Sequence, residues 1–442
     1  MDIDISLYDL SKMFDAMWYQ ETLNDMWDVG LQDDKFALMA RMNKECSVAV
    51  KTPAGITDRF TVQEIEMQGT VAGPIKACVQ VDTLGRDCYL YNEGLYLYKN
   101  CVKIPPLGMV DDIASISLCG IDSIKMNAII NSKIDSKKLE FGPSKCYNIH
   151  VGKKVENCCD LKVQGKVMKR KESEVYLGDI ICSSGTNDKN IAKKVNQGIG
   201  AVSEIFSTLS QVSLGHFYYE IALMFRDANL VSKLVSSSEV WYDVKKHEYK
   251  KLENIDEMFF RRMLEVPISV PKEGIYIEMG KMPVKYVIRI RRLMYWWHLV
   301  NLNSKEVLQK VYSAQKLNSS KGDWVVQLET DKKELKLNIT DEELKNYKQE
   351  EFKMLIKRKV EILAGKHLEE LRKSHSKTEK LVFNGFTPAA YLLSKNLTVH
   401  EVKTLFKLRT RMINVKANFS SNQDNLWCKA CLLFKETQEH LI

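Results

Sequence analysis

The strongest constraint on the fold is a change in hydrophobic periodicity near residue 185. Before it, strand-like and helix-like patterns follow one another: residues 3–8 alternate in character as a half-buried strand does, and residues 14–27 place aromatic side chains at helical spacing. After it, strand signals fade, and residues 191–209 and 217–235 have the apolar spacing of helices. Strands followed by a block of helices predict an α+β architecture with a small antiparallel sheet in its first part.

Two segments of the first part have the pattern of hairpins. Residues 47–51 and 59–63 flank the turn-forming sequence Pro53-Ala54-Gly55. Residues 102–117 are largely apolar, but Asp111-Asp112 interrupts them. Two charges beside apolar residues would be costly in a core, so we expect the acidic pair at a hairpin turn or at a metal ion.

Composition narrows the class of protein. Apolar residues make up 45% and charged residues 28%, which is typical of a soluble globular protein and excludes a disordered chain. The net charge of +8 favours an anionic partner such as nucleic acid, although a solvated basic surface explains it equally well. No run of about 18 uncharged apolar residues predicts a membrane span.

Cysteine usage and the N-terminus indicate the cellular setting. The 11 cysteines are scattered and odd in number, which argues against a secreted disulfide framework and for the nucleus or cytoplasm. The chain opens directly in a strand-like alternation, without the basic region of a signal peptide. We therefore expect this sequence to begin inside a longer domain.

Five short motifs follow one another between residues 8 and 178. An Asp-Asp pair alone is more often a solvated turn than a metal site, so the ordered set carries the argument. The motifs are Tyr8-Asp9-Leu10-Ser11-Lys12-Met13-Phe14-Asp15, Gln68-Gly69-Thr70-Val71-Ala72-Gly73-Pro74, Met109-Val110-Asp111-Asp112, Gly142-Pro143-Ser144-Lys145-Cys146 and Tyr176-Leu177-Gly178. In order and spacing they resemble the motifs of non-long-terminal-repeat (LINE-type) retrotransposon reverse transcriptases. Two departures are Gly73, where many members have Ser, and Met109, where an aromatic residue is usual.

The resemblance implies an RNA-directed DNA polymerase that uses an RNA template, a DNA primer and deoxynucleoside triphosphates. Nucleotidyl transfer by two Mg²⁺ ions needs carboxylates that converge on the metals. The resemblance assigns this role to Asp9, Asp111 and Asp112, with the backbone carbonyl of Leu10 as a possible further ligand. It assigns nucleotide contacts to Phe14, Gln68, Gly69 and Lys145, and a primer grip to Tyr176, Leu177 and Gly178. From the residues alone, Phe14 is equally well a core aromatic, and Lys145 is better explained as an ordinary surface lysine.

The resemblance also suggests a division into domains. Residues 1–182 would form the polymerase palm, and residues 183–300 a helical thumb and connector. The fingers would precede them, so we expect the chain as given to be an incomplete polymerase. Residues 301–395 would be a helical linker region, because 315–350 are rich in charge and poor in apolar anchors. Residues 396–442 would be a truncated zinc-knuckle-like tail that holds Cys428, Cys431 and His440. A structural Zn²⁺ needs four ligands, and this pattern offers three, so we expect zinc binding to be weak.

The segment 281–300 is basic and aromatic together, and it allows two interpretations. Arg289, Arg291 and Arg292 could grip a nucleic-acid backbone while Trp296 and Trp297 stack on bases. Alternatively, the segment is an amphipathic core helix whose arginines face water, which we favour.

Two other functions remain open at this stage. The chain could be a non-catalytic nucleic-acid-binding remnant of a retroelement. It could also be an RNA-dependent RNA polymerase, which shares the palm; Phe14 and the valine before Asp111 argue against that class.

Overall fold

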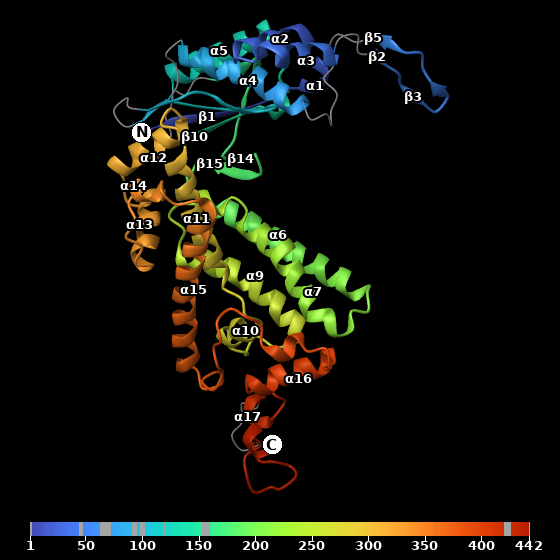
Figure 1. Ribbon diagram of the computed structural model, residues 1–442, viewed down its shortest axis with the longest axis vertical. Helices are drawn as coiled ribbons and strands as arrows, with labels where there is room; N and C mark the ends of the chain where they lie inside the picture. The colour runs from blue at the N-terminus through green and yellow to red at the C-terminus, as the bar shows by residue number, and fades with distance from the viewer. Residues whose placement is uncertain are drawn as a thin grey trace. The chain divides into compact units, whose positions relative to one another are not determined.

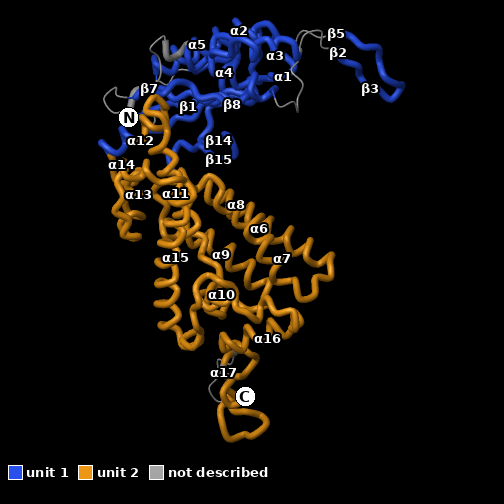
Figure 2. The backbone as a smooth tube through the Cα atoms, viewed as in Figure 1, with its two compact units in different colours: residues 1–186, 313–318 blue, residues 187–312, 319–442 orange. Residues whose placement is uncertain are grey.

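The computed structural model describes residues 2–43, 47–61, 72–90, 95–97, 102–118, 120–152, 160–419 and 426–441 (Figure 1). The chain forms two compact units (Figure 2). The first unit comprises residues 1–186 and 313–318, and it mixes strands with helices; the second comprises 187–312 and 319–442, and its described residues are helical. The α+β class expected from the sequence is therefore confirmed. The finer division at residues 300 and 395 stays a prediction.

A five-stranded sheet organises the first unit. Its strands lie in the order β13-β10-β1-β9-β8, with β1 antiparallel to both of its neighbours. The strands are β1 (Ile3–Asp9), β8 (Leu107–Met109), β9 (Asp112–Leu118), β10 (Tyr147–Val151) and β13 (Lys169–Arg170). The predicted strand at 3–8 and the predicted hairpin with its turn at the acidic pair are both present.

Helices cover one face of this sheet, and a hairpin covers the other. Tyr8 and Ile113 pack into a core with apolar side chains of α4 and α5, while Leu7, Ala114 and Ile149 point to the opposite face, where Tyr176 and Ile181 meet them. The helices of the unit are α1 (Met13–Ala16), α2 (Tyr19–Asp28), α3 (Asp33–Asn43), α4 (Gly73–Leu90) and α5 (Ile121–Ser136). The hairpin consists of β14 (Ser173–Tyr176) and β15 (Asp179–Cys182).

Short strand pairs complete the first unit. They are β2 (Ser47–Val48) with β5 (Phe60–Thr61), β3 (Lys51–Thr52) with β4 (Gly55–Ile56), β6 (Leu95–Leu97) with β7 (Val102–Ile104), and β11 (Lys162–Val163) with β12 (Lys166–Val167). The hairpin predicted around Pro53-Ala54-Gly55 is confirmed.

Residues 14–27, whose aromatic side chains have helical spacing, form two helices rather than one. Met17 and Trp18 adopt extended backbone angles and separate α1 from α2. Met17 is buried, and the Lys138 ammonium lies 3.9 Å from the centre of the Trp18 ring. Tertiary contacts of these two residues thus override the local helical pattern.

The helices of the second unit bury two apolar cores. One core joins α6, α7, α9, α10 and α16, and the other joins α11, α13 and α15. In chain order the helices from residue 187 onward are α6 (Asp188–Ser210), α7 (Tyr218–Phe225), α8 (Ser232–Val235), α9 (Lys246–Leu264), α10 (Lys272–Met279), α11 (Val284–Asn301), α12 (Val307–Leu317), α13 (Trp324–Glu334), α14 (Asp341–Leu344), α15 (Gln349–Ser374), α16 (Val399–Arg409), α17 (Lys416–Phe419) and α18 (Gln438–Leu441). None of the helices in the described part of the chain could cross a membrane.

The two helices predicted after residue 185 are present, with one modification. α6 contains the whole of 191–209. The segment 217–235 is helical throughout, but a π-helical stretch, Arg226–Val231, connects α7 to α8. The buried guanidinium of Arg226 makes two 2.7 Å hydrogen bonds with the carboxylate of Asp256 there.

The segment 315–350, which the sequence indicated to be a linker or a loosely packed helix, contains helices that pack into a core. It contains α13 and α14, and Leu328, Leu335, Leu337 and Leu344 are buried in the second core. The high charge content indicated a linker. A few well-placed leucines are enough to anchor a short helix, and the composition of a segment does not show where its leucines lie.

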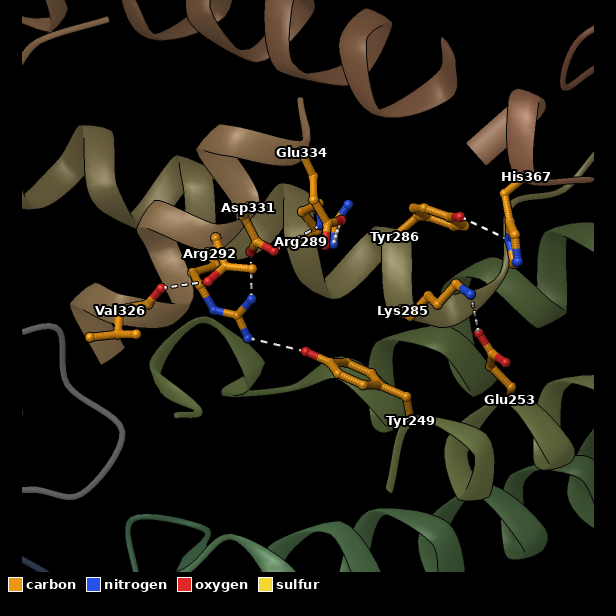
Figure 3. A network of polar contacts seen from close by, with 11 residues as sticks. Tyr249, Glu253, Lys285, Tyr286, Arg289, Arg292, Val326, Asp331, Glu334 and His367 are labelled. Atoms are coloured by element: carbon orange, nitrogen blue, oxygen red, sulfur yellow. Dashed lines mark hydrogen bonds and ion pairs between the residues drawn. The ribbon is translucent and has the colours of Figure 1, made fainter. Parts of the chain in front are cut away.

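The basic aromatic segment forms α11, and neither sequence interpretation describes its arginines. Arg292 is 1% exposed and lies 2.6 Å from Asp331, while Arg289 bonds to Asp331 at 2.9 Å and to Glu334 at 2.7 Å (Figure 3). Arg291 pairs with Glu239 at 2.8 Å and is 40% exposed. Each of the three arginines therefore pairs with an acidic side chain outside α11. Arg289 and Arg292 are largely shielded from water, and Arg291 is not.

The paired tryptophans of α11 serve the same core. The indole N–H of Trp296 donates to Tyr312 and Asp341, each at 3.0 Å, and that of Trp297 donates to the Tyr347 carbonyl at 3.0 Å. Trp296 is fully buried, so its ring cannot stack on a nucleic-acid base, and Trp297 is partly buried against the same core.

We expect Asp331→Ala to destabilise the protein by about 3–5 kcal/mol, because it leaves the buried Arg292 charge without its carboxylate. The exposed pair gives the matched control: Arg291→Ala should cost less than about 1 kcal/mol. Urea unfolding measures both. Replacing the buried pair together, Arg292→Met with Asp331→Leu, should recover most of the loss. Equal costs for Asp331→Ala and Arg291→Ala would contradict this account.

Candidate active site

The first feature of the site is a strand register. Asp9 ends β1, Asp112 begins β9, and the two residues are direct partners across the antiparallel pair. Directly opposed residues place their side chains on the same face, with Cβ atoms about 4.5–5.5 Å apart. The sheet therefore brings together two carboxylates that are far apart in sequence.

The third carboxylate stands in the turn before β9. Met109 pairs with Asp112, so Val110 and Asp111 form the two-residue connection between β8 and β9. Val110 has a φ of 58°, a left-handed conformation that is rare for a β-branched residue. The backbone N–H of Leu10 donates to the Asp111 carbonyl at 3.0 Å and ties this turn to the end of β1. Strain of this kind concentrates at functional sites, where the surrounding structure maintains it.

A one-turn 3₁₀ helix, Pro143–Lys145, completes the site from a third element. The Gly142 N–H donates to the Asp9 carbonyl at 2.9 Å, and a Cβ at this position would lie 2.9 Å from Asp9 Oδ2. Lys145 Nζ lies 3.3 Å from each oxygen of the Asp9 carboxylate. A side chain at this position would displace the Asp9 carboxylate, which Lys145 contacts from its other side.

Cys146 supports Asp9 from inside the core. The Asp9 N–H points to the Cys146 sulfur at 3.5 Å, and Cys146 is fully buried. Burial, aided by the charge of Asp9, raises the pKa of the Cys146 thiol to about 11. At neutral pH the residue is therefore a neutral thiol that fills space behind the carboxylate.

The charges of the site affect one another. Burial raises the pKa of Asp112 above its usual value, the negative charges of Asp111 and Asp9 raise it further, and Lys145 opposes them. The pKa of Tyr176 is also raised, by burial and by the charge of Asp112. Three carboxylates facing one ammonium leave an excess of negative charge, which favours binding of cations.

The donor set fits Mg²⁺ in its chemistry. Mg²⁺ prefers hard oxygen ligands and commonly takes one or two protein carboxylates together with substrate phosphate oxygens. The aspartates do not converge as tightly as a closed metal cage: among the described residues, only the tail has three ligand atoms within 4.8 Å of one another. Lys145, whose side chain is 68% exposed, supplies the positive charge beside Asp9 and has room to move when other cations bind.

The remaining sequence-predicted residues have mixed placements. Leu10 is buried and bridges to Phe141, and Phe14 packs against the core while staying partly exposed, as a core aromatic does. Gln68 and Gly69 lie outside the described residues.

Tyr176, Leu177 and Gly178 form the turn of the β14–β15 hairpin. Leu177 and Gly178 have φ of 47° and 87°, as both central residues of a type I′ turn do. The Tyr176 hydroxyl donates to the Leu107 carbonyl on β8 at 3.4 Å, which links this hairpin to the strand that precedes the acidic turn.

Gly142 and Cys146 belong to the fourth sequence motif, but the sequence did not indicate a role for either residue. The glycine directly before Pro143 was the available signal, since an X-Pro glycine often marks a close backbone approach. No local signal could show that the thiol lies behind Asp9, because that contact joins residues far apart in the chain.

The tail forms a second cluster with metal-binding chemistry. Cys428 Sγ, Cys431 Sγ and a nitrogen of His440 lie within 4.8 Å of one another, and Cys431 Sγ is 3.1 Å from His440 Nε2. Backbone N–H groups of Leu433 and Phe434 lower the pKa of the Cys431 thiol. A thiolate is the form that binds metal, and two sulfurs with one imidazole suit Zn²⁺.

Comparisons with known proteins give a limited result. No protein-family model matches the chain, and no curated protein sequence does. Among solved structures, telomerase from Candida albicans in complex with a fragment of telomeric RNA matches with a TM-score of 0.36 and 11% identity, over 58% of this chain and 47% of that one. Apo telomerase from Candida tropicalis gives 0.36 and 11%, over 74% and 53% of the two chains. The RNA-bound Candida tropicalis telomerase gives 0.34 and 12%, over 78% and 48%.

The chain thus spans about half the length of the telomerase structures that it matches. TM-scores this low do not establish a shared fold, so the functional assignment depends on the site residues themselves.

Asp112→Asn should raise Tm at neutral pH in the presence of EDTA, by at most a few degrees. Folding raises the pKa of the Asp112 carboxyl, so its ionised form destabilises the folded state at a pH above that raised pKa. This loss of stability disappears when the pH falls below the ordinary pKa of about 3.9. The gain should therefore shrink on acidification, as calorimetry can follow. Asp58→Asn, at an exposed hairpin position, is the control and should leave Tm unchanged. A lower Tm for Asp112→Asn would contradict the electrostatic account.

The tail should bind Zn²⁺ weakly, because a structural site draws its affinity from four ligands and the cluster has three. Competition of the purified chain with a chelating zinc indicator measures this affinity. Cys431→Ser should weaken the binding further, by about tenfold or more, while Cys78→Ser, an exposed thiol elsewhere, should not change it. Tight stoichiometric zinc would show the three-ligand argument to be wrong.

Proposed function

We propose that the chain is the RNA-directed DNA polymerase of a non-long-terminal-repeat retrotransposon. It would add deoxynucleotides to the 3′ end of a DNA primer on an RNA template. The observation that carries the proposal is the pairing of Asp9 with Asp112 across two strands, with Asp111 in the adjoining strained turn. Two-metal nucleotidyl transfer needs carboxylates held on neighbouring backbone segments, and this register supports that role for the three aspartates.

The reaction joins the primer to the α-phosphate of the incoming nucleotide. The 3′ oxygen forms a bond to the α-phosphorus, the bond to the pyrophosphate oxygen breaks, and the hydroxyl proton passes to solvent. Two Mg²⁺ ions held by Asp9, Asp111 and Asp112 would supply the charge that activates the hydroxyl and stabilises the leaving pyrophosphate. The protein contributes the fixed positions of the three carboxylates, because their backbones belong to a hydrogen-bonded sheet and turn.

Lys145 would act on the triphosphate. Its exposed ammonium already lies 3.3 Å from Asp9, so a small movement brings it to a phosphate that binds at the same carboxylate. There it would balance charge or donate a proton to the leaving pyrophosphate.

The other motif residues would position the substrates. Phe14 would exclude the ribose 2′ hydroxyl, Gln68 and Gly69 would contact nucleotide and template, and the half-exposed turn at Leu177 and Gly178 would hold the primer. Turn backbone of this kind can approach a nucleic-acid strand closely, because glycine carries no side chain. We also propose the nucleus or cytoplasm as its compartment, since the described cysteines are free thiols.

Primer extension on an RNA template with Mg²⁺ and deoxynucleotides tests the proposal. We expect extension that falls by about 100-fold or more in Asp111→Asn, because each carboxylate acts on developing charge in the transition state. Asp82→Asn, a surface aspartate on α4, is the control and should extend normally. Extension that Asp111→Asn leaves intact would refute the site assignment. Salt-sensitive RNA binding without any extension would instead favour the non-catalytic remnant.

A further inference from the structure

A cavity of about 430 Å³ lies in the second unit, away from any residue assigned above. One wall is the exposed side of α15, and the other is the loop that carries Phe383, Gly385 and Phe386. Its volume falls in the range of small-molecule pockets, about 300–1,000 Å³. The cavity is thus large enough for a planar organic group.

The apolar part of the cavity is held in a fixed geometry. A Cβ at Gly365 would lie 2.7 Å from Phe383 Cε1, so the glycine lets the Phe383 ring lie directly on α15. Phe386 meets this ring edge to face, with centroids 5.4 Å apart at 77°. Gly385 has a φ of 75°, which turns the chain back between the two rings. Ile362, which is 52% exposed, completes the apolar lining.

Two cations of α15 flank these rings. Arg358 and Lys366 line the cavity, and neither has a hydrogen-bond or ion-pair partner among the residues that the structure describes. The acids of the same wall have other basic partners: Glu361 lies 3.9 Å from Lys357, and Glu369 accepts two hydrogen bonds from Arg372 at 2.6 and 2.7 Å. The cavity therefore combines aromatic walls with an uncompensated positive charge.

We propose that this cavity binds an unpaired base of single-stranded nucleic acid. The base lies against Phe383 and Phe386, and the adjoining phosphates pair with Arg358 and Lys366. Stacking on aromatic rings combined with basic residues along the backbone is how proteins hold single strands without reading sequence. Arg358 and Lys366 are eight residues apart, about 12 Å along the helix axis, so they contact the strand on both sides of the seated base. A base inside a duplex cannot enter, because it is stacked and paired. The site does not depend on polymerase chemistry.

Fluorescence anisotropy with the full chain tests the proposal, using labelled oligo(U) and oligo(dT) 12-mers and a duplex of equal length. Arg358→Gln with Lys366→Gln should weaken single-strand binding by about tenfold and reduce the slope of log affinity against log salt by about 1.4. Lys353→Gln with Lys373→Gln removes the same charge from other positions of α15 and should change binding less than about twofold. Equal losses in both double variants, or an equal loss for the duplex, would overturn the proposal.

Ile362→Lys separates the cavity from general electrostatics. The substitution adds a positive charge at an exposed position of α15 but removes an apolar wall. If a base binds in the cavity, the Ile362→Lys variant should bind single strands about threefold or more weakly than the unmodified chain. If charge alone attracts the strand, the variant should bind more tightly. The unchanged circular dichroism spectrum of the variant would show that α15 is intact, and tighter binding would refute the proposal.

Discussion

The pairing of β1 with β9 is the constraint on which the first unit depends. Its register sets Asp9 opposite Asp112, and a slip of one residue would turn one of the two carboxylates to the other face of the sheet. The same register sends alternate side chains to the helix-covered face and to the β14–β15 hairpin. The Leu10–Asp111 and Gly142–Asp9 hydrogen bonds then fix the two loops that complete the site. Site and core are thus two consequences of one strand alignment.

The site carries costs that the surrounding packing offsets. Burial and two neighbouring negative charges raise the pKa of Asp112 and so disfavour its ionised form, and Val110 and Leu177 hold left-handed backbone angles. Conformations of this kind cost about 1–3 kcal/mol each. Tyr8 and Ile113, beside the carboxylates in sequence, are almost completely buried under the helices, where full burial of such side chains contributes about 1.5–3 kcal/mol apiece. An acidic cluster can therefore persist at the rim of a sheet whose apolar neighbours anchor it.

The sequence pattern correctly predicted those elements whose formation depends on interactions between residues close together in the chain. The strand at 3–8, the turn at the acidic pair and the helix over 191–209 follow from periodicity and turn chemistry, and the structure contains all three. The break at Met17-Trp18 was not predictable, because the burial of Met17 and the contact of Trp18 with Lys138 both depend on residues far away in the sequence. The buried Arg292 of α11 was missed for the same reason, since its partner Asp331 lies 39 residues away in the sequence. For the site, the motifs named the aspartates and Lys145, but the support from Cys146 needed the fold.

The contrast between α11 and α15 shows why net charge is a poor guide to where nucleic acid would bind. The basic and aromatic segment 281–300 places its arginines against Asp331, Glu334 and Glu239. Most of its positive charge is therefore compensated by acids of the same unit. On α15, by contrast, Arg358 and Lys366 keep theirs, beside two rings that pack edge to face. A phosphate is attracted by charge that remains uncompensated at the surface, and it is attracted most where water is partly excluded. The cations that matter for binding are those without acidic partners, and they stand out only once every ion pair has been assigned.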